Sequence, residues 1–163
     1  MAFTAKPIRI GRIPGGGQEN VIAFPYQAGQ DFLLGAVLNL STGEVVEAST
    51  DPTSVAGISL QGTDTNPGQD AANSPVEVTG VFVGVSVAVA DKVTQFVSDI
   101  VSGSDAPLTP LQSDVGDVMG LLLRADGTWA ADRAASASII TVVDIDVDNN
   151  SVIWTFVSTA LEL

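Results

Sequence analysis

The chain contains no cysteine and no histidine among its 163 residues. Without cysteine, disulfides, thiolate nucleophiles and cysteine-based metal sites are excluded. Without histidine, Ser-His-Asp and Cys-His catalysis, histidine-ligated zinc and the commonest general base near neutral pH are excluded as well. An enzyme is therefore the class of protein that this composition favours least, and no cofactor is predicted.

Positive charge is also scarce, with six Lys and Arg against nineteen Asp and Glu. An acidic body repels nucleic-acid phosphates, so nucleic acid is not an expected partner. The longest apolar stretch, Val81 to Ala90, is about half of the ~20 residues that a membrane helix needs. The first residues, Met1 to Pro7, lack the apolar run of a secretory signal. We therefore expect a soluble, unexported protein with no membrane partner.

The few cations are unevenly distributed. Lys6, Arg9 and Arg12 all precede the first acid, Glu19, so the first dozen residues carry +3 and the rest, with nineteen acids against three cations, carries −16, which gives the net −13. Complementary potentials at two ends of a molecule steer encounter and fix orientation. This polarity predicts a partner that meets the basic head.

Residues 1–19 are predicted to form an extended N-terminal arm. Pro7 and Pro14 flank a short segment in which apolar Ile8 and Ile10 alternate with other residues. The Gly15 to Gly17 run that follows predicts a flexible linker. We expect the arm to stay mobile in the free protein and to become ordered on a neighbour by adding a strand to a sheet edge. The alternative is an ordinary disordered terminus.

Residues 20–163 are predicted to form one all-β domain. The 45% hydrophobic content indicates a folded chain, while sixteen glycines, eight prolines and abundant β-branched residues favour short strands and turns. An antiparallel barrel or sandwich follows. The expected strands are Val21 to Tyr26, Leu33 to Leu40, Glu44 to Ser49, Val55 to Gln61, Val76 to Ala90, Val118 to Arg124, Thr128 to Asp132, Ile139 to Val147 and Ser151 to Thr159.

Between these strands the sequence predicts turns, one long loop and one irregular segment. Tight hairpins are expected at Ser41-Thr42-Gly43 and across Asp148 to Asn150, and Asp126-Gly127 predicts a type I′ turn. The polar stretch 63–75 is predicted to be a solvent-exposed loop. Near Thr79-Gly80 the alternation of valines with other residues shifts by one position, which suggests a β-bulge. Residues 91–117 are irregular, with Lys92 to Val101 either one helical turn or a strand.

The strand Ile139 to Val147 carries an acidic alternation. We expect Thr141, Val143, Ile145 and Val147 to be buried, and the aspartates on the opposite face to meet solvent. Those aspartates, Asp144, Asp146 and Asp148, match the first three oxygen positions of an EF-hand loop. Asn149 replaces its glycine and Thr155 its bidentate glutamate, so a solvated strand face is preferred and no metal site is predicted.

Two tryptophans are the remaining residues of interest. Trp129 and Trp154 each fall in a predicted strand, where a lone Trp is usually a core residue or an interface anchor. A sugar-stacking platform is the alternative reading.

The stretches Leu34 to Ala48 and Val55 to Leu60, and the ending Val152 to Leu163, resemble the head decoration, or cement, proteins of tailed bacteriophages. The similarity covers residues 30–62 and 115–163. It implies a small antiparallel β-barrel or β-tulip domain, made in the host cytoplasm and usually trimeric. It also implies binding to the major capsid protein on the outer surface of the virion, at three-fold or quasi-three-fold positions.

The resemblance further implies an N-terminal arm that clamps neighbouring capsid subunits across their seams. The arm residues that would bind the capsid are Lys6, Pro7, Ile8, Arg9, Ile10 and Arg12, and the trimer or interface anchors would be Trp129 and Trp154. Two alternatives remain open: another virion β module, such as a tail or fibre component, and a carbohydrate-binding module.

Overall fold

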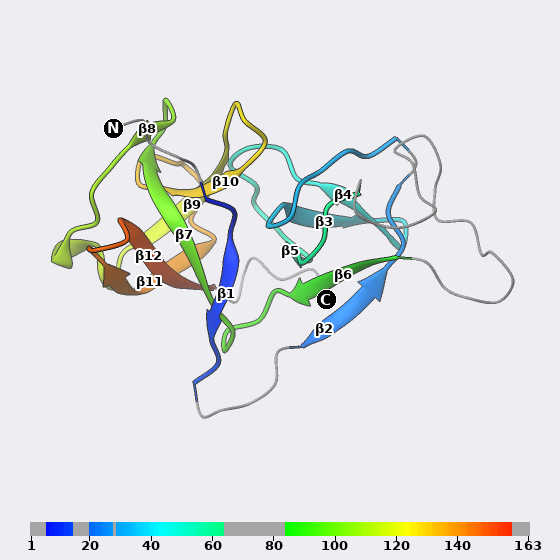
Figure 1. Ribbon diagram of the computed structural model, residues 1–163, viewed down its shortest axis with the longest axis horizontal. Coiled ribbons are helices and arrows are strands. Elements are labelled where there is room, and N and C mark those ends of the chain that lie inside the picture. Colours follow the sequence, from blue (N-terminus) through cyan, green and yellow to red (C-terminus); the bar gives the residue numbers. More distant parts are fainter. Residues whose placement is uncertain (1–5, 15–19, 28, 64–83, 158–163) are drawn as a thin grey trace, which may run out of the picture.

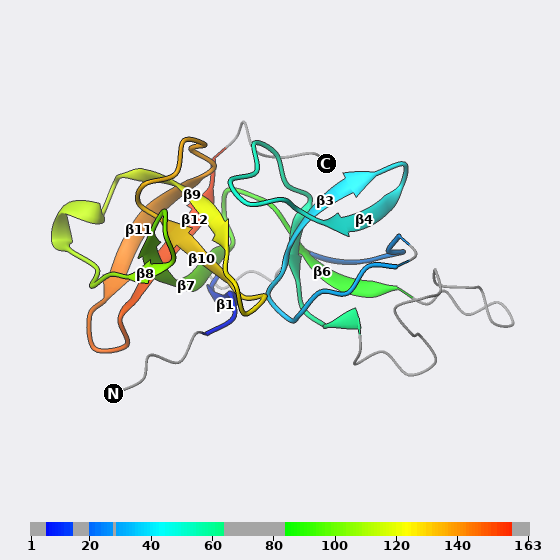
Figure 2. The same ribbon diagram turned by 90° about the horizontal axis from the view of Figure 1, so that it is seen from above.

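A computed structural model describes residues 6–14, 20–27, 29–63 and 84–157. Within these ranges the regular secondary structure is nearly all β-strand, apart from a short 3₁₀ turn, η2, at Gln112–Asp114. The predicted all-β, antiparallel-rich class is confirmed. The architecture differs from a single barrel, because the strands form two sheets that lie side by side in Figures 1 and 2.

The larger sheet, here called the ring sheet, curls round on itself. Its strand order is β1-β7-β10-β9-β11-β12, and β12 pairs back onto β7. β7 also pairs with β8, and all of these pairings are antiparallel except that of β7 with β10. The strands are β1 Arg9–Arg12, β7 Gln95–Ser102, β8 Ala106–Pro107, β9 Val118–Leu123, β10 Trp129–Asp132, β11 Ile140–Asp146 and β12 Ser151–Phe156.

The smaller sheet is antiparallel throughout, in the order β2-β6-β5-β3-β4. Just after β2, Val45 N donates to Pro25 O (2.8 Å) and Gln27 N donates to Val45 O (3.1 Å), so the chain covers the outer edge of β4. Among the described strands, β2 is left as the open edge of this sheet. The strands are β2 Val21–Phe24, β3 Val37–Ser41, β4 Glu44–Glu47, β5 Gly57–Ser59 and β6 Val85–Val89.

All three predicted hairpins are present, and one has a different turn. At β3–β4, Thr42 (φ 53°) and Gly43 (φ 87°) both adopt the left-handed region. At β9–β10 only Gly127 does (φ 80°), and its N–H donates to Arg124 O (3.0 Å). The Asp126-Gly127 turn is therefore not type I′, which needs positive φ at both residues.

The predicted burial pattern is wrong over the first half of β11 and at Val147. Val147 lies beyond the end of β11 and is 56% exposed. Within the strand, Ile140 and Val142 are buried, whereas Thr141 and Val143 are only half-buried. The reason is a register shift between Val142 and Asp144, where a β-bulge changes the face on which later side chains lie.

The segment predicted to be irregular contains β7, which has more partner strands than any other described strand. Its polar residues Gln95, Ser98 and Asp99 are all buried, and this hid the apolar pattern of a core strand. Of the strand predicted over Val76 to Ala90, β6 is the described part. The proposed bulge near residue 79, the loop 63–75 beyond Thr63, and the glycine run 15–17 lie outside the described residues.

The N-terminal segment is built into the ring sheet. β1 pairs with β7 through Arg9↔Val97 and Ile10↔Phe96, on the edge that β12 leaves open (Figure 1). Ile8 is 2% exposed and belongs to the core cluster that spans both sheets. The expectation that the arm stays mobile until it meets a neighbour is therefore wrong for residues 6–14.

Replacing Ile8 with Ala should lower the free energy of unfolding by about 2–5 kcal/mol, because the change leaves a cavity in the core. Ile22→Ala is the matched control: Ile22 is 41% exposed, so its loss should cost about 1 kcal/mol or less. Denaturant unfolding measures both values. Equal, small losses would show that the N-terminal segment does not pack as described.

The two sheets are joined by hydrogen bonds to the last residue of β4 and to the chain that follows it. Trp129 Nε1 donates to Glu47 Oε1 (2.9 Å), and Leu123 N donates to Thr50 Oγ1 (3.0 Å). The Asp51 carboxylate accepts from the backbone N–H groups of Ser136 (3.1 Å) and Ala137 (3.0 Å). These contacts fix the orientation of the smaller sheet on the ring sheet.

Gly120→Ala should weaken this junction by about 1–3 kcal/mol, because overpacking of a tight site forces its neighbours apart. A Cβ at Gly120 would lie 2.7 Å from both Asp51 Oδ1 and Ala137 O. Gly103→Ala is the control, since the nearest atom to a Cβ there is 3.6 Å away. Thermal unfolding should separate the two variants, and equal midpoints would contradict the tight junction.

Candidate functional site: the basic edge strand

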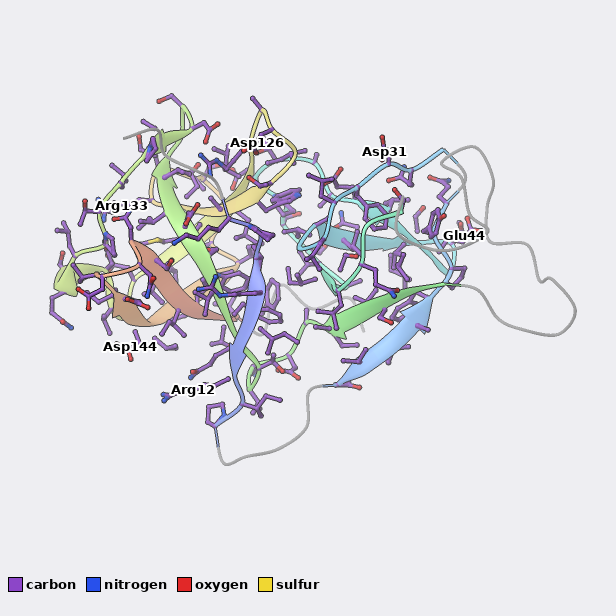
Figure 3. All side chains as sticks on the ribbon, in the orientation of Figure 1. Arg12, Asp31, Glu44, Asp126, Arg133 and Asp144 are labelled. Carbon is purple, nitrogen blue, oxygen red and sulfur yellow. The ribbon has the colours of Figure 1, made fainter. Side chains whose placement is uncertain are left out.

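The residues predicted to bind a capsid lie on or beside β1, and they divide into two sets. Ile8 is buried and Ile10 packs partly buried against the core, so neither is available to fill a groove on a partner. Arg9 and Arg12 are exposed, while Lys6 and Pro7 are half-buried. Figure 3 places Arg12 at the periphery of the molecule, at the far end of β1. The outer side of β1 is thus a basic edge.

Lys6 fastens the start of this segment to β7 and to the β11–β12 turn. Its backbone N–H donates to Asp99 Oδ2 (3.0 Å), and its Nζ donates to Asn149 O (2.8 Å). At the other end of β1, Arg12 Nε donates to Gln95 Oε1 (2.8 Å). The strand is therefore held at both ends by side-chain contacts in addition to its backbone pairing.

Asp99 is the buried anion beneath the basic edge strand. Its side chain is fully buried, and Arg124 Nη1 lies 3.4 Å from Oδ2. Arg124 is in turn held by Asp105, with Nε 2.6 Å from Oδ1. Asp99 Oδ1 has no hydrogen-bond partner among the described residues. Burial raises the pKa of Asp99 above its ordinary value, although the Lys6 backbone N–H and the charges of Lys6 and Arg124 oppose this rise.

The expectation that Trp129 and Trp154 anchor an interface is wrong, because both have an exposed fraction of 0%. Each indole N–H is satisfied internally, Trp129 by Glu47 and Trp154 by Ser98 Oγ at 2.9 Å. Trp154 also stacks on Phe96, with ring centroids 5.0 Å apart. Neither ring can offer a face to a sugar.

Of the aspartates of the β11–β12 hairpin, Asp146 accepts hydrogen bonds within the turn. Asn149 donates to Asp146 through its backbone N (3.1 Å) and its Nδ2 (2.7 Å), and these bonds lower the pKa of Asp146. Asp144 lies at the outer periphery of the ring sheet in Figure 3. Within the described ranges no group of three or more acidic side chains has the geometry to hold a metal ion. Those ranges also contain no helix of the length and apolar character needed to span a membrane.

The sequence predicts a strand over Val21 to Tyr26, which contains β2, but it does not predict that β2 is exposed. Val21 and Ile22 are each 41% exposed, although an uncharged V-I-A-F run is typical of a buried strand. The signal that could have distinguished the two cases is the register of the β2–β6 pairing, which the sequence alone does not supply.

Comparisons with known proteins give no family for the chain. No protein-family model matches it, and no curated protein is significantly similar to it in sequence.

The charge of Asp99 should make stability depend on pH in a defined direction. Because the folded state raises its pKa above the ordinary 3.8, the stabilising contribution of Asp99 is full below that value and is lost as the pH rises through the folded pKa. Asp99→Asn does not titrate. The free energy of unfolding of the variant, minus that of the wild type, should therefore increase between about pH 3.8 and neutrality. Denaturant unfolding at several pH values measures this difference, and a flat or falling profile would contradict the assignment.

Proposed function

We propose that the chain is a structural decoration, or cement, protein of a phage head, without enzymatic activity. In this proposal it binds the outer surface of the expanded capsid as a trimer and bridges neighbouring major capsid proteins. The observation that carries the proposal is the basic edge strand β1, fixed on the surface of an otherwise acidic protein. The resemblance of residues 30–62 and 115–163 to decoration proteins supports the same function.

The charges of the described residues favour β1 as the docking element. Arg124 and Arg133 are used internally, in ion pairs with Asp99 and Asp105 and with Asp114. Arg9 and Arg12 are exposed and form no ion pair within the described chain. An acidic protein surface is the partner that this edge complements, because positive and negative potentials steer the two surfaces together.

A fixed strand suits a stabilising role. Ordering a mobile segment costs about 1–2 kcal/mol per residue, and a strand that its own fold already orders avoids this cost on docking. In a trimer, weak contacts on several capsid subunits act at high effective concentration. The protein would then strengthen the shell by joining subunits across their seams.

Another virion β module, such as a tail or fibre component, is the second candidate. The two differ in where the protein lies on the particle: a decoration protein labels the whole shell, and a tail component labels one vertex. The burial of Trp129 and Trp154 removes the feature on which carbohydrate binding rested.

Binding to expanded heads of the encoding phage that lack this protein tests the proposal. Arg9→Gln and Arg12→Gln should each weaken co-sedimentation with the heads roughly three- to tenfold, and added salt should weaken wild-type binding because it screens exposed charges. Lys92→Gln removes an exposed cation that lies outside β1, in the turn before β7, and should bind more like the wild type.

Equal binding by all three variants would show that the contact does not involve β1. Absence of any binding to the shell would contradict the decoration function itself.

A further inference from the structure

The strand β2 has an unpaired backbone edge whose orientation can be worked out. Val89 N donates to Asn20 O (2.8 Å), which places the backbone groups of residue 20 on the side of β6. Because these groups alternate sides along a strand, those of Ile22 and Phe24 also face β6, and those of Val21 and Ala23 face outward. The bond from Val45 N to Pro25 O, on the outer side, agrees with this alternation.

Within the described chain, the outward N–H groups of Val21 and Ala23 donate no hydrogen bond and their outward C=O groups accept none. The side chains of β2 do not protect this edge, because the strand contains no charged residue and no proline. Natural proteins protect exposed edges with charge, proline or a covering segment, as the arginines of β1 and the segment over β4 do here. An edge left open, with Val21 and Ile22 each 41% exposed, is a template for another strand.

We propose that β2 pairs with β2 of a second copy of this chain. The two strands would run antiparallel about a two-fold axis at Ile22, with Val21 of each copy opposite Ala23 of the other. Val21 and Ala23 would then exchange N–H···O=C bonds in both directions, which satisfies every outward group of both residues. The large Val21 would meet the small Ala23, and the two Ile22 side chains would cover each other.

Two features favour a second copy of this chain over a strand of a different protein as the partner of β2: self-complementarity and charge. The free groups repeat symmetrically about Ile22, as a two-fold interface requires. Each molecule carries a net charge of −13, so two copies repel each other overall. A contact through β2 adds no local repulsion, because β2 contains no charged residue. The contact is short and falls below the ~1,200 Å² of a stable interface, so the association is weak and concentration-dependent. Salt should strengthen it by screening the repulsion.

Ala23→Pro tests the backbone pairing. Proline removes the outward N–H of residue 23, and it leaves the backbone groups of Ile22 and Phe24 facing β6 untouched. Sedimentation equilibrium over a range of concentrations should show a wild-type mass that rises with concentration, as β2 edges pair, and an association that tightens with salt. The variant should have a dissociation constant raised roughly tenfold or more, with far-UV circular dichroism like that of the wild type.

A cross-linking pair tests the register without a proline. The chain has no cysteine, so Ile22→Cys places a single thiol at the proposed axis, where facing residues are close enough to form a disulfide. Val93→Cys is the control, because Val93 is also exposed, at 53%, and lies away from β2. Under mild oxidation, Ile22→Cys should form covalent dimers several-fold faster than Val93→Cys.

A wild type that stays monomeric at millimolar concentration would overturn the β2 proposal, as would equal cross-linking of the two cysteine variants. An oligomer whose mass and affinity do not change in Ala23→Pro would also overturn it, and a trimer of that kind would leave the proposed decoration function intact. Retained binding of Ala23→Pro to heads separates the two proposals.

Discussion

The pairing of β1 with β7 is the contact on which the ring sheet depends. At Phe96 and Val97, β12 pairs with one edge of β7 and β1 pairs with the other. β7 therefore has no open edge along these residues. The same pairing places Ile8 in the core and brings the Lys6 N–H to the buried carboxylate of Asp99. Loss of the segment would leave this buried charge with less compensation, which is costly in a protein interior.

This contact changes how the charge asymmetry of the chain is understood. A basic head on an acidic body suggests a tether, but the head is a fixed strand that presents Arg9 and Arg12 at the sheet edge. The molecule therefore has two edges of different character, β1 basic and β2 uncharged. The first suits an acidic protein surface and the second suits another copy of the chain, so the two proposed contacts do not compete for the same residues.

The sequence was sufficient where local chemistry decides the structure, and insufficient where distant residues decide it. The β3–β4 hairpin follows from the turn residues Ser41-Thr42-Gly43, and the all-β class follows from composition. The sequence left β7 undecided between a helical turn and a strand because Ser98 and Asp99 are polar, and their burial is explained only by partners elsewhere in the chain. The backbone N–H of Lys6 donates to Asp99, which is 93 residues away in the sequence. No local sequence pattern reveals a contact over that separation.

The central claim is that the basic N-terminal segment is ordered in the free protein. Amide hydrogen exchange of the isolated protein, followed by mass spectrometry over peptides that cover residues 6–12 and β7, tests it most directly. Residues 6–12 should exchange slowly, with protection that approaches that of β7. Exchange of residues 6–12 at the rate of an unstructured peptide, with β7 still protected, would contradict it and restore a mobile arm.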